Sequence, residues 1–197
     1  IKYAKLWRIY WLSNLVIFLG PPGAGKGTQA VSIAQEKNLA HISTGDMLRE
    51  HVSNETELGR IAKSLLDEGK LVPDSLVIEM LQERLLSEDC VNGAILDGFP
   101  RTIAQAESLD NVSADFKISK VIVFEAERDE LIKRILNRGE TSGRSDDTKE
   151  SVSVRLEVYE NDTAPLIKYY ELKNLVAKIN AVGEVENICN LILKEFE

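Results

Sequence analysis

The sequence predicts an α/β protein built on a doubly wound five-stranded parallel sheet. Five short apolar runs, most of them rich in β-branched residues, recur along the chain, and intervals of helical length separate them. Strands of this kind suit a parallel sheet with helices on both faces, because neither face meets water. The runs cover residues 15–20, 38–42, 93–97, 120–126 and 174–180.

The intervals between these runs predict helices with recognisable entry signals. The segments "ISTGD" at 42–46 and "VPDS" at 72–75 place a capping residue or a proline where a helix begins. Two polar segments, 43–72 and 137–147, interrupt the pattern, and we expect them to be mobile lobes beside the sheet. The predicted helices cover residues 25–37, 44–52, 57–68, 74–87, 101–110, 127–137 and 148–171.

Composition limits the classes of protein that the chain can belong to. A length of 197 residues with 44% hydrophobic residues fits one compact domain. A net charge of −8 argues against a nucleic-acid partner, and no run of about 18 apolar residues predicts a membrane span. Residues 1–14 are basic and aromatic, so we treat them as an extension of unknown role before a single domain at 15–197.

The segment "GPPGAGKGTQ" at 20–29 predicts a phosphate-binding loop. Its glycines let backbone amides turn inward, and the helix that follows directs its N-terminus at the same point. Lys26 adds a positive charge between phosphates, while Thr28 reaches a magnesium ion or a phosphate. The residue after Lys26 is Gly27, so the hydroxyl arrives one place later than in the common pattern. The loop alone does not distinguish GTPase switches, motors and nucleotide kinases.

The segment "ILDGFPRT" at 95–102 predicts a second set of site residues. Asp97 closes a buried strand, where its carboxylate can hold magnesium directly or through water. Gly98 permits close approach of the backbone, and Arg101 supplies a bidentate fork for phosphate. In "HISTGDMLRE" at 41–50, Arg49 can point along the same cleft.

Arginines that flank the second polar segment predict a closing clamp for transferred phosphate. Two of them are four residues apart on one helix face, one lies in the segment itself and one lies on the helix after it. These arginines are Arg134, Arg138, Arg144 and Arg155, and Asp146 and Asp147 lie among them.

Five motifs in order give the chain a resemblance to the adenylate kinases over residues 15–196. They are "GPPGAGKGTQ", "HISTGDMLRE", "GKLVPD", "LDGFPRT" and "GRSDD". The resemblance implies a fold of the P-loop nucleoside triphosphate hydrolase type. It also implies a nucleoside-monophosphate (NMP) lobe at 43–72, a short lid at 137–147 and no structural zinc. Glycine after the loop lysine is that family's own variant.

The resemblance also implies a role for each matching residue. Lys26, Arg101, Arg138, Arg144 and Arg155 would be catalytic, Asp146 and Asp147 would stabilise the closed lid, and Thr28 and Asp97 would hold magnesium. The ATP site would comprise Gly23, Ala24, Gly25, Lys26, Gly27, Thr28, Arg134, Arg138 and Gly183. The AMP site would comprise Thr44, Arg49, Lys70, Leu71, Val72, Gly98, Phe99, Arg101, Gln105, Arg144 and Arg155.

The expected reaction is the magnesium-dependent transfer ATP + AMP ⇌ 2 ADP. The AMP phosphate is already anionic, so no general base is required, and His41 and His51 lie in no base-like constellation of the sequence. A UMP/CMP kinase is the alternative, but Thr44 and Thr102 favour AMP because resembling UMP/CMP kinases usually carry alanine and asparagine there. A non-catalytic nucleotide sensor is the second alternative. The expected partners are small-molecule nucleotides, and we expect a monomer in the cytoplasm.

Overall fold

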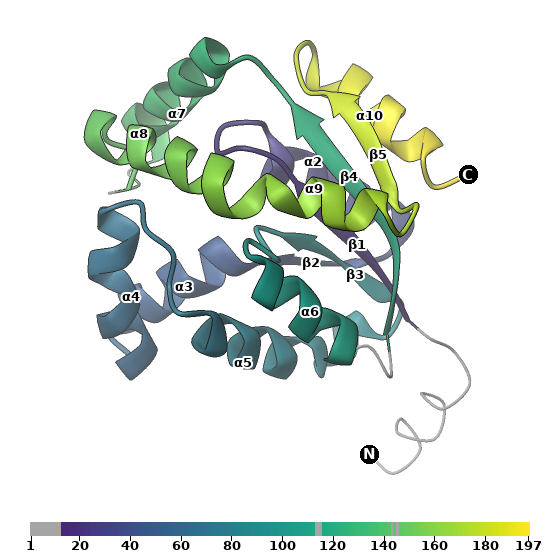
Figure 1. Cartoon of the computed structure of the whole chain (residues 1–197), viewed down its shortest axis with the longest axis horizontal. Helices are drawn as coiled ribbons and strands as arrows, with labels where there is room; N and C mark the ends of the chain where they lie inside the picture. The colour runs from purple at the N-terminus through teal and green to yellow at the C-terminus, as the bar shows by residue number, and fades with distance from the viewer. Residues whose placement is uncertain (1–12, 113–115, 143, 145) are drawn as a thin grey trace.

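The computed structural model describes residues 13–112, 116–142, 144 and 146–197, and these form an α/β fold around one sheet (Figure 1). All four neighbouring pairs of strands are parallel, in the order β2-β3-β1-β4-β5. The predicted doubly wound five-stranded sheet is therefore confirmed. Its strands are β1 (Ser13–Leu19), β2 (Ala40–Ser43), β3 (Gly93–Asp97), β4 (Phe116–Glu125) and β5 (Val176–Asn180).

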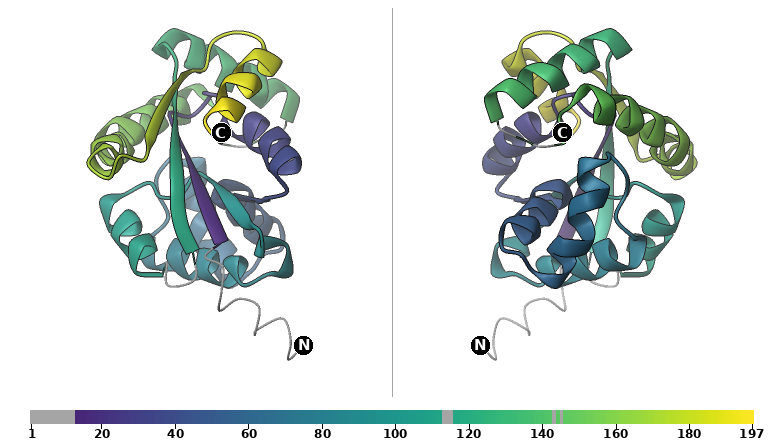
Figure 2. Two further views of the ribbon diagram at one scale, coloured as in Figure 1. Left: turned by 90° about the vertical axis from the view of Figure 1, so that its right-hand side faces the viewer. Right: turned by 90° about the vertical axis from the view of Figure 1, so that its left-hand side faces the viewer.

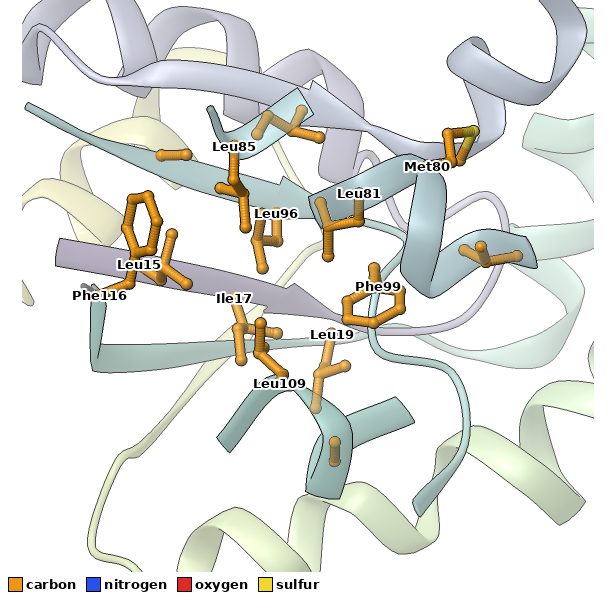
Figure 3. Close-up of a cluster of buried hydrophobic side chains, with 14 of the residues drawn as sticks. Leu15, Ile17, Leu19, Met80, Leu81, Leu85, Leu96, Phe99, Leu109 and Phe116 are labelled. Carbon is orange, nitrogen blue, oxygen red and sulfur yellow. The ribbon is translucent and has the colours of Figure 1, made fainter. Parts of the chain in front are cut away.

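Alternating side chains of β1 build the two halves of the core. Leu15, Ile17 and Leu19 belong to one buried cluster, whereas Val16 and Phe18 belong to the other, because successive strand residues point to opposite faces. Figure 3 shows the first cluster, in which the β1 leucines and Ile17 lie among side chains of other elements, such as Leu81, Leu96 and Leu109. The sheet is buried on both faces, which explains the continuous apolar runs of its strands.

Helices cover both faces of the sheet (Figures 1 and 2). One cluster takes side chains from α5 (Asp74–Leu85), α6 (Ile103–Val112) and α9 (Pro165–Glu171). The other takes them from α2 (Lys26–Lys37), α7 (Arg128–Ser142), α8 (Lys149–Val158) and α10 (Val185–Lys194). The remaining helices are α3 (Thr44–Ser53) and α4 (Glu57–Asp67), with short η1 (Glu88–Cys90) and π-helical η2 (Tyr159–Thr163).

Several predicted boundaries are wrong, each for a local reason. β1 begins at Ser13, so the last two residues of the predicted 1–14 extension are in the sheet, and residues 1–12 lie outside the described ones. α7 continues to Ser142, into the segment 137–147 expected to be irregular. The helix predicted at 148–171 divides into α8, η2 and α9, because the chain makes a π-turn before Pro165. α10 was not predicted.

The order of strands places two loops side by side at one edge of the sheet. β1 lies between β3 and β4, so the direction of winding reverses there and the carboxyl ends of the strands open a crevice. Phe18 is in register with Asp97, which brings the loop after β1 next to the loop after β3. Among the described residues, no helix combines the length and apolar character needed to cross a membrane.

Candidate active site

The loop after β1 presents unpaired backbone amides and one lysine to the crevice. α2 begins at Lys26 behind Gly25, and no described side chain caps it, so its first N–H groups are free to meet an anion. The Lys26 ammonium donates to the carbonyls of Gly20 at 2.7 Å and Pro21 at 2.9 Å. These two bonds fold the Lys26 side chain back onto the loop.

Asp97 lies directly against the start of α2. A Cβ on Gly27 would stand 3.2 Å from Asp97 Oδ2, which explains why glycine follows the lysine. His41 in β2 places Nε2 3.7 Å from the same oxygen. Burial alone would raise the pKa of Asp97, but the neighbouring His41 ring and the Lys26 ammonium outweigh it and hold that pKa below its usual value.

The loop after β3 holds the second group of predicted residues together. Gly98 has φ +80°, and a Cβ there would lie 2.9 Å from an Arg101 nitrogen, so the Arg101 side chain packs directly against this glycine. The Gly98 carbonyl accepts hydrogen bonds from the Thr44 hydroxyl at 2.8 Å and from Arg101 Nε at 2.8 Å. These bonds tie the first residue of α3 to the arginine.

The predicted clamp is a network of arginines around two buried carboxylates. Arg138 donates from Nε and Nη2 to the two oxygens of Asp147, both at 2.7 Å, and Arg155 donates to Asp147 Oδ1 at 2.6 Å. Arg155 also lies 3.2 Å from Asp146 Oδ2. The carboxylates thus set the position of both guanidinium groups, which are in the cleft wall.

Two ion pairs join the segment 43–72 to the segment 137–147 across the cleft. Arg144 Nη2 lies 3.1 Å from Asp46 Oδ1, and Arg49 Nη1 lies 3.8 Å from Asp146 Oδ2. The two polar segments that the sequence singled out therefore face each other, and Figure 1 shows α4 of the first segment below α8, the helix that follows the second.

The resulting cleft has a volume of about 330 Å³ and an excess of positive charge. Burial, followed by repulsion from Arg155, lowers the pKa of Arg101, and burial with repulsion from Arg49 lowers that of Arg144. Both shifts come first from burial and then from repulsion between neighbouring cations. The cationic lining residues are Lys26, Arg49, Arg101, Arg138, Arg144 and Arg155, against the carboxylates Asp46 and Asp97.

The structure brings most of the predicted site residues to this cleft. Those in its lining, besides the cations, are Gly23, Gly25, Gly27, Thr28, Leu71, Asp97 and Gly98. Those that are buried behind it are Ala24, Thr44, Val72, Phe99, Gln105, Asp146 and Asp147, and Lys70 is exposed beside Glu68.

Arg134 and Gly183 lie apart from the cleft lining, but both are at the segment that follows β5. Arg134 donates from Nη1 to the Ala181 carbonyl at 2.9 Å and from Nε to Glu130 at 2.7 Å. Gly183, two residues after Ala181, is exposed, and a Cβ there would meet nothing within 4 Å. Their predicted place at a nucleotide base stays a prediction.

Sequence reasoning missed His41 and the residues of the π-turn. His41, Tyr159 and Thr163 line the cleft. The sequence shows no base-like constellation around His41, and the structure adds Asp97 as a neighbour of the ring. Burial raises the pKa of Tyr159 to about 12, and the Thr163 hydroxyl donates to the Arg101 carbonyl at 2.9 Å. Pro165 was the available signal, because proline disrupts regular helix upstream of itself.

These features define the class of protein. A phosphate loop at the switch point of a parallel sheet binds a nucleoside triphosphate, and a facing wall of arginines receives a second phosphate, as in the P-loop nucleoside monophosphate kinases. The adenylate kinase family model matches residues 18–175. The chain belongs to the adenylate kinase family, and it is a phosphotransferase of the nucleoside monophosphate kinase class.

Curated relatives agree over nearly the whole chain. An adenylate kinase of Bifidobacterium longum is 45% identical over 184 residues, which cover 92% of this chain and 99% of the relative. One from Leptospira biflexa is 46% identical over 91% of this chain and 97% of the relative. One from Thermus thermophilus is 45% identical over 90% of this chain and 94% of the relative.

Proposed function

We propose that the protein catalyses ATP + AMP ⇌ 2 ADP, with the γ-phosphoryl group transferred between two nucleotides that lie end to end in the cleft. The observation that carries this proposal is the pair of cationic walls. Lys26 and the phosphate loop form one wall, and Arg101 with Arg49 forms the other. Membership of the adenylate kinase family supports the choice of AMP as acceptor.

Each wall has its own proposed nucleotide. The loop at 23–28 would hold the ATP phosphates, with Arg134 and Gly183 at the ATP base. Thr44, Arg49, Gly98, Arg101 and Gln105 would hold AMP, with the backbone at 70–72 and Phe99 behind it. Arg138, Arg144 and Arg155 would grip the phosphates between them. Segment 43–72 would act as the NMP lobe and 137–147 as the lid, whose first residues 137–142 are helical.

Catalysis would then consist of alignment and charge stabilisation. The attacking group is an anionic phosphate oxygen of AMP, which bonds to the γ-phosphorus of ATP as the bond to the ADP leaving oxygen breaks. No proton needs to move, so the His41–Asp97 contact is not required as a base. Closure of the lid excludes water that would otherwise compete with AMP, and adenylate kinases are a standard example of such gating.

The cleft suits a magnesium ion. Among the described residues, no group of three or more acidic, histidine or cysteine side chains forms a metal site. Magnesium commonly uses one or two carboxylates, phosphates and water instead, and Asp97 beside the loop fits that requirement. When bound, the ion would neutralise charge on the ATP phosphates, with Asp97 and Thr28 as its protein partners. Assembly as a monomer and a cytoplasmic location stay predictions.

A panel of acceptors tests this function. With Mg-ATP as donor, we expect phosphorylation of AMP at least tenfold faster, in kcat/KM, than of GMP, UMP or CMP, a difference of about 1.4 kcal/mol. ATP alone is the hydrolysis control and should be stable. A preference for UMP or CMP would show that the pyrimidine alternative is correct, and binding of nucleotides without any transfer would favour the sensor.

The titration of Lys26 gives the proposal a pH dependence. Burial lowers the pKa of Lys26 from 10.5 to about 8, although Asp97 opposes the shift. Because ATP phosphates favour the protonated lysine, we expect the affinity for ATP to fall as pH rises above about 8, by up to about tenfold per unit, with proton uptake on binding. Calorimetry at pH 7 to 9, in buffers of different ionisation enthalpy, measures both quantities.

The free energy of unfolding should change with pH in the direction opposite to the ATP affinity, because it should rise as the pH rises. Between pH about 8 and 10.5 the unfolded lysine holds more protons than the folded one, so Lys26 adds stability as pH rises through this window.

For the ATP-binding experiment, Lys26→Met is the control, since it should abolish the extra proton uptake on binding. An ATP affinity that stays constant up to pH 9 would contradict the assignment.

A further inference from the structure

The side-chain amide of Gln105 is held by protein groups at both ends. Its Nε2 donates to Asp74 Oδ1 at 2.7 Å, and its Oε1 accepts from the Arg101 backbone N–H at 2.7 Å. A carboxylate can only accept and a peptide N–H can only donate, so these two partners set which end of the amide is nitrogen. Gln105 is only 2% exposed, which limits other orientations.

Asp74 is itself anchored from the other side. It is the first residue of α5, and its Oδ2 accepts from the Thr102 hydroxyl at 2.8 Å. The Thr102 oxygen in turn accepts from the Gln105 backbone N–H at 3.2 Å. The carboxylate therefore joins the beginnings of α5 and α6 and has one oxygen for each of its two partners.

The restrained amide keeps one donor and one acceptor for a ligand. A primary amide has two N–H hydrogens and two lone pairs on oxygen, and the protein uses one of each. On its Watson–Crick edge, a 6-aminopurine presents an amino donor next to the acceptor nitrogen N1, whereas a 6-oxopurine presents an acceptor oxygen next to the N1–H donor. An unrestrained glutamine could flip its amide to suit either base. Gln105 could do so only by losing its hydrogen bond to Asp74 and by placing its Nε2 hydrogens against the Arg101 backbone N–H.

We propose that Asp74 makes the acceptor site selective for 6-aminopurine monophosphates over 6-oxopurine monophosphates, by holding the Gln105 amide in one orientation. The proposal rests on the proposed function, which assigns Gln105 to the AMP site, and it takes the base of AMP as the group that Gln105 contacts. Asp74 is not in the cleft lining, so it is a positioning residue and acts through Gln105. The same bonds also cap α6, and the test must separate selectivity from stability.

The comparison of AMP with IMP isolates the polarity of the base edge, because IMP replaces the 6-amino group with a 6-oxo group. Asp74→Asn keeps the shape of the side chain, but its amide can donate as well as accept, so it no longer specifies the orientation of Gln105. We expect the ratio of kcat/KM for AMP to that for IMP to fall about tenfold, the equivalent of one charged hydrogen bond. The apparent KM for ATP should be unchanged.

Two further variants make the result decisive. Asp110→Asn is the matched control, because it neutralises a carboxylate on α6, the helix that carries Gln105, but one that bonds Tyr169 and Lys173 away from the cleft, and it should leave the ratio unchanged. If Asp74→Asn does not fold, Thr102→Val releases the second oxygen of Asp74 and should lower the ratio in the same direction, while Thr102→Ser should restore it.

The outcomes distinguish this inference from the proposed function on which it rests. Wild-type protein that fails to phosphorylate AMP would overturn both. Wild-type protein that prefers AMP, with Asp74→Asn reducing kcat/KM for AMP and IMP by the same factor, would leave the function standing and show that Asp74 only caps the helix.

Discussion

Replacement of Arg101 by alanine should lower kcat/KM for AMP by about 10²- to 10³-fold. Its Nε is bonded to the Gly98 carbonyl, and burial together with the nearby Arg155 lowers its pKa although Asp97 and Asp146 oppose the shift, so carboxylates of the protein compensate the cation only in part. A bound phosphate would supply the remaining negative charge through hydrogen bonds worth about 1.5–3 kcal/mol each. A coupled assay of ADP formation, with AMP varied at saturating Mg-ATP, measures the loss.

Comparison variants show whether the bidentate geometry of the Arg101 guanidinium group or only its positive charge matters. Arg101→Lys keeps the charge but loses bidentate geometry, so it should recover only part of the activity. Arg60→Ala, an exposed position on α4, should retain wild-type kinetics. Arg138→Ala should lower kcat as well, since that side chain is in the facing wall. Unchanged kcat in both Arg101→Ala and Arg138→Ala would refute the proposed clamp.

Asp147→Asn should lower the free energy of unfolding by about 2–3 kcal/mol. Asp147 is 6% exposed and accepts three hydrogen bonds from Arg138 and Arg155, so its neutralisation leaves two guanidinium groups without their shared carboxylate. Burial would raise the pKa of Asp147, but the bond from Arg138 outweighs it and lowers that pKa. Its contribution is thus present at neutral pH and lost as pH falls through the lowered value.

Thermal unfolding measures the effect as a decrease in Tm of roughly 4–10 °C for a chain of this size. The matched control is Asp89→Asn, which breaks the more exposed pair with Arg84 and should cost less than about 1 kcal/mol. The two arginines should also lose their alignment, so kcat should fall in Asp147→Asn but not in Asp89→Asn. Equal decreases in Tm for the two variants would contradict the central role of Asp147.

Features encoded by local sequence were predicted well. The apolar runs predicted all five strands, and the loop at 20–29, the Asp97 strand end and the cap at Ser43 lie where the sequence placed them. Each depends on residues within one or two turns of each other, so its signal is complete in a short window. Ile188 and Ile192 are buried on α10, and their helical spacing was an available signal that was not used.

Features set by distant partners could not be predicted in this way. α7 reaches Ser142, and Arg138 on it binds Asp147 in the returning chain, a contact that no local periodicity reveals. The amide of Gln105 depends on Asp74, which is 31 residues away. Burial of Gln105 behind the cleft, rather than in its lining, follows from that bond and from the packing of α5 against α6.

The distribution of the cleft residues along the chain has a consequence for how activity arises during folding. The phosphate loop comes from the beginning of the described chain, and Arg138, Arg155 and Thr163 arrive more than 100 residues later. Contacts of such separation require closure of long loops and form late relative to local helices. A consecutive fragment that ends before α8 lacks Arg155 and Thr163 of the cleft, so a nascent or truncated chain of that length would have an incomplete site and no turnover. Recovery of catalysis after denaturation would therefore report completion of the entire sheet and its helices.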